Sequence, residues 1–103
     1  MPFIILNLGD NMDYQERKLC EQYFKKLVIK RIRKLRISHG LTQAQLAEAI
    51  DVSHEYIRSL ESEKGKNSFS AFTIWRISKV LNVSLDYLLD FDLEKIRKKQ
   101  CRE

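Results

Sequence analysis

The chain has 103 residues, of which 44% are hydrophobic, and it contains only three glycines and one proline. This length closes one core and leaves no room for the second layer that most enzymes need. The composition excludes a disordered or loop-rich chain and favours a compact, helical protein. The formal net charge of +5 favours a polyanionic partner, either a nucleic acid or an anionic membrane.

The charge is distributed unevenly along the chain. Residues 25–36 contain seven basic side chains and no acidic one, and by default such a run is a solvated helix face that acts through long-range attraction. Residues 37–63 contain one basic side chain, Arg58, against five acidic ones: Glu48, Asp51, Glu55, Glu61 and Glu63. The positive field therefore comes from outside residues 37–63.

Neither end of the chain predicts export or a membrane span. The apolar run at residues 3–8 lacks a basic flank and is too short for a signal peptide or a span, so residues 1–11 are expected to form an extended or disordered arm. Cys20 and Cys101 are too few for a disulfide framework and have no metal-ligand spacing. A reduced, cytoplasmic setting is expected.

Apolar residues recur at three- and four-residue steps from Asp13, a predicted N-cap, to Gly40. This pattern predicts either one long helix or two helices joined near Lys25. Hydroxyl caps predict shorter helices over residues 43–50, 54–62, 71–81 and 85–89; the caps are Thr42, Ser53, Ser70 and Ser84. The tail, residues 90–103, is expected to hold a last exposed helix, so the predicted fold is all-α.

Residues 41–60 have the pattern of a helix-turn-helix. The apolar positions form two amphipathic helices that share one core: Leu46, Ala47, Ile50, Val52, Ile57 and Leu60. Only three or four residues separate the helices, which predicts a crossing near a right angle. Ala47 has to stay small for this close crossing, and Val52 is expected to anchor the turn in the core.

The sequence resembles the XRE family, the Cro and phage-repressor class of helix-turn-helix proteins, in three ordered blocks: RIRKLRISHGLTQAQLAEAI, DVSHEYIRSLE and ISKVLNVSLDYLL. The resemblance covers about residues 28–89. It implies a five-helix, lambda-repressor-like domain whose third helix enters the major groove of double-stranded DNA while the second crosses the backbone. The expected division is an N-terminal arm and helical extension that can lengthen the first helix (1–24), the DNA-binding domain (25–89) and a charged C-terminal tail (90–103).

One position departs from the family pattern. Asp51 stands where the family usually has glycine, at a turn position whose φ is often positive. Aspartate tolerates this conformation better than most residues, at ~1 kcal/mol of strain, so the motif is expected to survive.

The resemblance implies four base-reading residues at the exposed start of the third helix: His54, Glu55, Arg58 and Ser59. Arg58 can bind guanine through two hydrogen bonds. Phosphates repel Glu55 unless it accepts from cytosine N4 or orients Arg58, and its spacing also allows an ion pair with Arg58 in the free protein. The alternative for His54 is an exposed histidine without a role.

Six further residues are implied to contact the DNA backbone: Gln43, Ser53, Tyr56, Lys64, Lys66 and Asn67. The first begins the second helix, the next two lie near the sugar-phosphate wall, and the last three form the loop after the third helix. Arg36 and Glu61 match a family ion pair that ties the first helix to the end of the third and positions the recognition helix.

The expected function is that of a sequence-specific, repressor-like transcriptional regulator. A homodimer on an inverted-repeat operator is expected because one small reader contacts too few base pairs for useful specificity. A phage repressor, a restriction controller and a self-repressing antitoxin all fit, and each implies a bacterial or phage gene. No enzyme, cofactor or metal site is expected, because the sequence lacks a nucleophile with its base, a phosphate loop and paired His or Cys ligands.

Two alternatives stay open. The acidic residues around the reading face favour a protein-interaction module, or an antitoxin component, that retains the fold with weak or partner-dependent DNA binding. Both termini exceed the minimal domain, so they can build the dimer or bind a partner protein. Phe69, Phe72 and Trp75 are interpreted as a core or dimer-contact cluster rather than a ligand pocket.

Overall fold

The computed structural model describes residues 13–64, 68–92 and 95–96. Five helices follow one another: α1 (Tyr14–Ser38), α2 (Gln43–Ala49), α3 (His54–Glu61), α4 (Ala71–Leu81) and α5 (Leu85–Leu89). No strand occurs within these ranges, so the expected all-α fold with five helices is confirmed. The arm at residues 1–11, Lys66, Asn67 and Cys101 lie outside the described residues.

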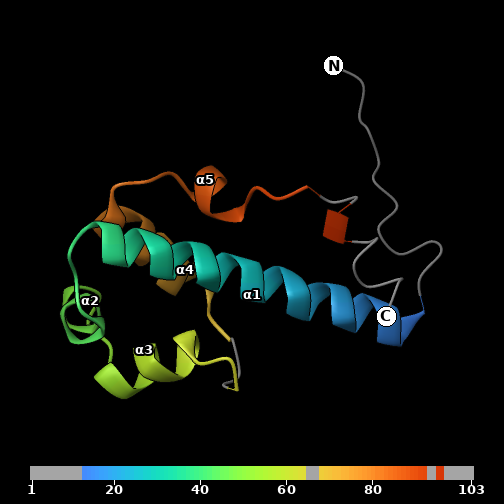
Figure 1. Cartoon of the computed structure of the whole chain (residues 1–103), viewed down its shortest axis with the longest axis horizontal. Coiled ribbons are helices and arrows are strands. Elements are labelled where there is room, and N and C mark those ends of the chain that lie inside the picture. Colours follow the sequence, from blue (N-terminus) through green and yellow to red (C-terminus); the bar gives the residue numbers. More distant parts are fainter. Residues whose placement is uncertain (1–12, 65–67, 93–94, 97–103) are drawn as a thin grey trace.

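Helix α1 is continuous, which decides against two helices joined near Lys25. The Asp13 carboxylate accepts a hydrogen bond from the Glu16 backbone N–H at 2.8 Å, as expected of an N-cap. Gly40 takes a left-handed φ of 71° just past the end of the helix. With 25 residues, α1 is about 37 Å long and is the central helix of the fold. Helix α5 lies on one side of it, and α2 and α3 lie on the other (Figure 1).

The four predicted hydroxyl caps all begin helices. In each, the side-chain oxygen accepts from a backbone N–H three residues later, and Gln45 completes a capping box with Thr42. Helices α2 and α3 each end one residue earlier than expected. Ile50 already turns toward Asp51 with ψ 10°, and Ser62 is extended with ψ 137°, so both are C-caps instead of helical residues.

The turn between α2 and α3 has the expected left-handed residue, since Asp51 has φ 58°. The Val52 backbone N–H donates to the Ala47 carbonyl at 2.9 Å, and the Val52 side chain is half-buried against the core. Ala47 itself is 2% exposed, as its place between two crossing helices requires. The turn thus fixes the angle between α2 and α3 through both backbone and side-chain contacts.

One core lies beneath all five helices. Among the described residues it consists of Val28, Ile29, Ile32, Leu46, Ala47, Ile50, Ile57, Leu60, Ile74, Ile77, Leu81 and Leu88. Every apolar position predicted to point inward from the helix-turn-helix is in this set, apart from the half-buried Val52. No helix in the described part of the chain is long and apolar enough to cross a bilayer.

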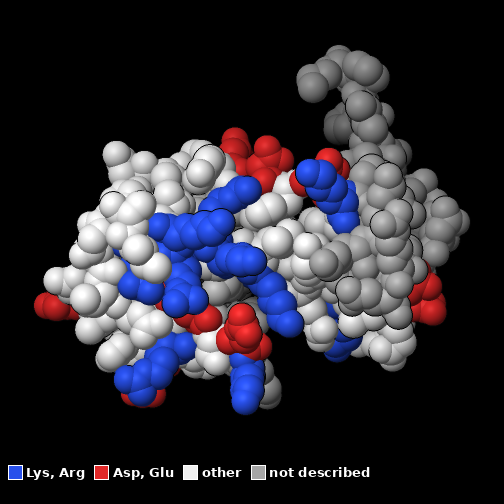
Figure 2. Space-filling view, in the orientation of Figure 1, with Lys and Arg blue, Asp and Glu red and all other residues white. Residues whose placement is uncertain are grey.

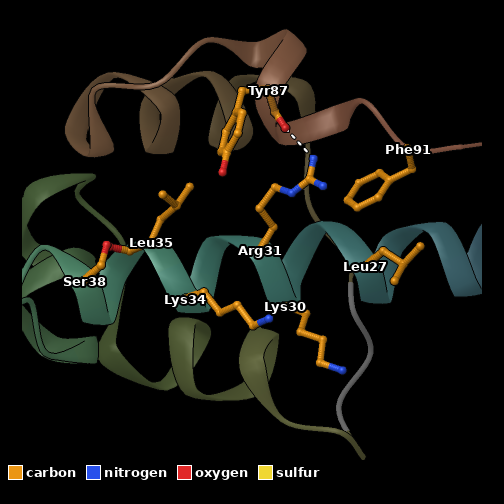
Figure 3. A pocket seen from close by; sticks show the side chains of 8 residues that line it. All are labelled: Leu27, Lys30, Arg31, Lys34, Leu35, Ser38, Tyr87 and Phe91. Carbon is orange, nitrogen blue, oxygen red and sulfur yellow. Dashed lines mark hydrogen bonds between the residues drawn. The ribbon is translucent and has the colours of Figure 1, made fainter.

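The segment after α5 folds back onto α1. The Phe91 ring meets the Phe24 ring edge-on, with centroids 5.9 Å apart, and the Arg31 guanidinium lies 4.0 Å from the Phe91 centroid. Arg31 also donates to the backbone carbonyl of Tyr87 (Figure 3) and to that of Asp90, so it caps the end of α5. Ile96 is only 5% exposed. The tail therefore begins with residues that pack, which its charged composition did not predict.

Candidate nucleic-acid interface

The four residues predicted to read bases share the exposed face of α3. His54, Glu55, Arg58 and Ser59 are all exposed. Ile57 and Leu60, on the opposite face of the helix, are 0% and 2% exposed. Helix α3 lies at the edge of the molecule (Figure 1), and its polar side chains are exposed to solvent. The structure thus brings the four predicted reading residues together on one exposed face.

Arg58 and Glu55 form the intrahelical ion pair that their spacing allowed, with 3.2 Å between Arg58 Nη1 and Glu55 Oε1. Both side chains are largely in water, at 59% and 75% exposed. An exposed pair of this kind contributes less than about 1 kcal/mol, so docking on DNA can break or retain it at little cost. The pair partly neutralises Glu55 on the surface that would face phosphates.

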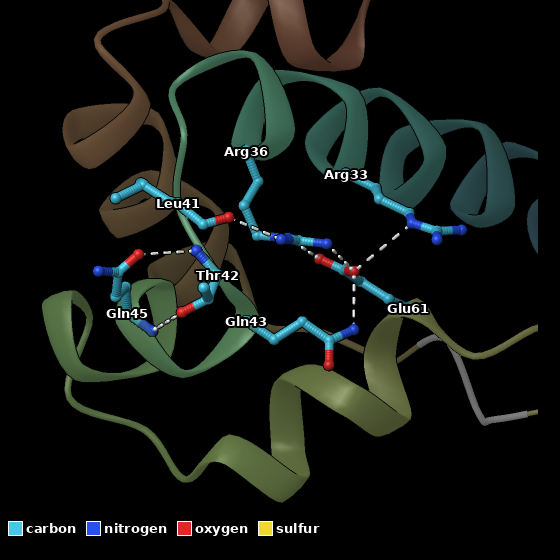
Figure 4. A network of polar contacts seen from close by, with 7 residues as sticks. All are labelled: Arg33, Arg36, Leu41, Thr42, Gln43, Gln45 and Glu61. Atoms are coloured by element: carbon cyan, nitrogen blue, oxygen red, sulfur yellow. Dashed lines mark hydrogen bonds and ion pairs between the residues drawn. The ribbon is translucent and has the colours of Figure 1, made fainter.

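A buried ion pair ties α3 to α1, as the family resemblance implied. Arg36 donates to both carboxylate oxygens of Glu61, at 2.8 and 2.9 Å, and to the Leu41 carbonyl at 2.7 Å (Figure 4). The two side chains are 8% and 3% exposed. Bidentate geometry and a third hydrogen bond satisfy the desolvated charges. One guanidinium thereby connects α1, the turn before α2 and the end of α3.

Two more residues join this network. Gln43 Nε2 donates to Glu61 Oε1 at 3.0 Å, and Arg33 Nε lies 3.9 Å from the same oxygen (Figure 4). Neither contact was predicted from the sequence. Arg33 precedes Arg36 by three residues, so both lie on one face of α1, and this spacing could have identified Arg33. The contact from Gln43 to Glu61 joins residues 18 positions apart, for which no local pattern exists.

Of the residues predicted to contact the DNA backbone, three make hydrogen bonds within the protein: Gln43, Ser53 and Tyr56. In the free protein the Gln43 amide nitrogen is held by Glu61, so a phosphate contact uses the N–H groups at the start of α2 or displaces that bond. Ser53 caps α3 by accepting from the Tyr56 N–H, and the Tyr56 hydroxyl donates to the Ser68 carbonyl at 3.2 Å. Lys64 is exposed beside the end of α3.

Comparison with known proteins identifies the family. A model of the helix-turn-helix family matches residues 32–88 of the chain. An uncharacterized HTH-type transcriptional regulator of Archaeoglobus fulgidus is 38% identical over 66 residues, which cover 64% of this chain and 91% of that protein. No solved structure matches the chain significantly.

Two further relatives are uncharacterized HTH-type transcriptional regulators of Rickettsia. The protein of Rickettsia conorii is 37% identical over 71 residues, or 69% of this chain and 54% of the relative. The protein of Rickettsia prowazekii is 36% identical over 70 residues, or 68% of this chain and 52% of the relative. The chain thus spans about half the length of these two relatives. With the family match and the geometry of α2 and α3, the chain belongs to the XRE-type helix-turn-helix family of DNA-binding transcriptional regulators.

Proposed function

We propose that the protein is a sequence-specific repressor that binds an inverted-repeat operator as a homodimer, with α3 in the major groove. The observation that carries this proposal is the exposed polar face of α3 on a helix held in place by the buried pair of Arg36 and Glu61. A reading helix must keep its angle to the duplex when it docks, and a buried bidentate pair between α1 and α3 supports that angle.

Within this function, the residues of α3 have different roles. Arg58 binds guanine through O6 and N7, and Glu55, 3.2 Å from Arg58 in the free protein, orients the guanidinium or accepts from cytosine N4. His54 and Ser59 flank this pair on the same face and read neighbouring base edges. The start of α2, near Gln43, and Lys64 supply phosphate contacts that carry no sequence information.

An exposed aromatic pair on α4 supports the homodimer. Phe72 and Trp75 stack with ring centroids 6.0 Å apart, although they are 62% and 45% exposed. The core interpretation is therefore wrong for these two rings, while Phe69 is half-buried against the core. Large exposed rings are typical of the energetic centre of an interface. In the proposed dimer, a second copy covers the exposed rings of α4, which are separate residues from the exposed polar face of α3.

The alternative, a protein-interaction module that has lost DNA binding, is less well supported. Its basis is the set of acidic residues around the predicted reading face. Glu61 is neutralised by Arg36 and Glu55 by Arg58, so two of the five carboxylates no longer act as isolated charges on this surface. The remaining acidic residues do not stand on the exposed face of α3.

Selection of bound duplexes from a random pool, followed by mobility shifts over a range of salt concentrations, tests the proposal. The expected result is one preferred palindrome with half-sites about one helical turn apart and a steep loss of affinity with salt. Arg58→Ala is expected to relax the preference at one base position, while Lys64→Ala weakens binding to all sequences alike. Absence of any preference, or of binding at low salt, would overturn the repressor assignment.

A further inference from the structure

A basic stripe runs along α1 beyond the helix-turn-helix. Lys26, Lys30 and Arg33 are all exposed and follow one another at steps of four and three, so they lie on one face of the helix. They line a hollow of about 600 Å³ between α1 and the segment after α3, which contributes Lys64. Lys and Arg side chains gather over the middle of α1 on the viewed face (Figure 2). These three residues are called the α1 stripe below.

The charge of the α1 stripe is not compensated within the described part of the chain. Lys26 and Lys30 have no hydrogen-bond or ion-pair partner there, and Arg33 has only the 3.9 Å contact with Glu61. That carboxylate is already bound by Arg36 at 2.8 Å. Glu63 is the other acidic residue in the lining of the hollow. The hollow therefore presents an excess of positive charge to solvent.

The C-terminal end of the α1 stripe, at Arg33, lies where the helix-turn-helix is expected to contact phosphate. Arg33 and Gln43 both approach the same oxygen of Glu61, at 3.9 and 3.0 Å, so the last residue of the stripe adjoins the start of α2 (Figure 4). From this point the stripe extends about 10 Å toward the start of α1. DNA carries one phosphate per strand every 3.4 Å along its axis, so this length can face two or three of them.

The geometry points to a second DNA contact: the α1 stripe binds backbone phosphates of the operator outside the half-site that α3 reads. This inference rests on the proposed function and adds to it a surface that sets affinity without setting sequence preference. DNA is favoured as the occupant because the hollow shares Lys64 with the region beside the recognition helix. It is also favoured because residues 37–63 are net acidic and need phosphate contacts from elsewhere.

The test uses the full chain and the selected operator in two forms, one with about ten flanking base pairs on each side and one trimmed to the half-sites. The stripe variant combines Lys26→Gln, Lys30→Gln and Arg33→Gln. The control variant combines Lys18→Gln, Lys34→Gln and Lys95→Gln, three exposed lysines outside the hollow, so that both variants lose the same charge. Circular dichroism checks that both variants fold.

On the long duplex, the slope of log affinity against log salt is expected to be shallower by about two to three in the stripe variant, at about 0.9 for each lost phosphate contact. The control variant is expected to retain the wild-type slope. On the trimmed duplex, wild type and stripe variant are expected to converge. Operator preference over a scrambled duplex is expected to stay unchanged in a variant that combines only Lys26→Gln and Lys30→Gln, which lie outside the Glu61 network. Arg33→Lys in place of Arg33→Gln is expected to restore the contribution of that residue.

Two outcomes would overturn the inference. If stripe and control variants show equal slopes, α1 acts only through its long-range field, and the repressor function is unaffected. If wild type loses nothing on the trimmed duplex, the flanking phosphates are not contacted. A wild-type protein without any operator preference is a different result, because it removes the proposed function and with it the premise of the flanking contact.

Discussion

Glu61 carries a charge that is almost completely withdrawn from water, because its side chain is 3% exposed. Its partners come from α1 and from α2, and the carboxylate itself belongs to the last turn of α3. A charge in this position depends on its hydrogen bonds, since removal of one partner leaves the other buried and unpaired. The residue is therefore expected to affect both the stability of the protein and the placement of α3.

Glu61→Ala is expected to lower the free energy of unfolding by about 3–5 kcal/mol, because Arg36 would stay buried without its carboxylate. Urea denaturation followed by circular dichroism measures the change. Glu63→Ala, two residues further on and exposed, is the matched control and is expected to change stability by less than about 0.5 kcal/mol. Equal effects of the two substitutions would contradict the account of the buried pair.

Asp51 tests the backbone of the turn. With φ 58°, it occupies a conformation that costs an L-residue about 1 kcal/mol and glycine much less. Asp51→Gly is therefore expected to raise the free energy of unfolding by up to about 1 kcal/mol, despite the larger conformational entropy of glycine in the unfolded chain. The thermal midpoint is expected to rise slightly as a result. Glu48→Gly, an exposed position within α2, is expected to do the opposite. A loss of stability in Asp51→Gly would show that the side chain, not the backbone, sets the turn.

At the scale of the elements, the close crossing of α2 and α3 requires a small side chain at position 47. Ala47 is 2% exposed where the two helices cross. Ala47→Leu is expected to cost about 1–3 kcal/mol by overpacking and to abolish operator binding, because α3 is pushed out of its position. Ala49→Leu, at the exposed end of α2, keeps the same change in volume and is expected to bind normally. Mobility shifts with both variants compare them directly.

The starts of the helices could be predicted because their signals are local. Ser70, for example, accepts from the Thr73 N–H three residues away, and both residues can be seen in the sequence. The predicted ends were less accurate. Ile50 fits the apolar spacing of α2, but its backbone already belongs to the turn, so it is a C-cap. The choice between one first helix and two could not be made, because apolar spacing alone does not show a break.

At the scale of the whole molecule, the contacts that escaped prediction join distant parts of the chain. The rings of Phe24 and Phe91 meet across 67 positions, and Arg31 caps α5 from the middle of α1. Phe91, in the predicted tail, therefore packs against α1. The candidate reading face could be predicted because it lies within one short helix, whereas the contact of Gln43 with Glu61 required the tertiary fold.

The proposed homodimer is a property of the whole molecule, and the aromatic pair on α4 allows a direct test of it. Trp75→Ser and Phe72→Ser remove large exposed rings, at 45% and 62%, so they are not expected to unfold the chain. If the pair forms the centre of the dimer contact, each substitution is expected to weaken dimerisation by about 30-fold or more, as for an aromatic hot spot. Sedimentation at several concentrations measures this change.

Leu19→Ser is the matched control, because it removes an apolar side chain that is 47% exposed on α1 instead of α4. It is expected to leave dimerisation unchanged. The operator provides a second measurement, since a monomer reads one half-site and loses the gain in specificity that two-fold pairing supplies. If the chain dimerises normally without both rings, the dimer contact lies on another surface. Truncation of the two termini would then be the next experiment, because the proposed dimer must keep α3 exposed in both copies.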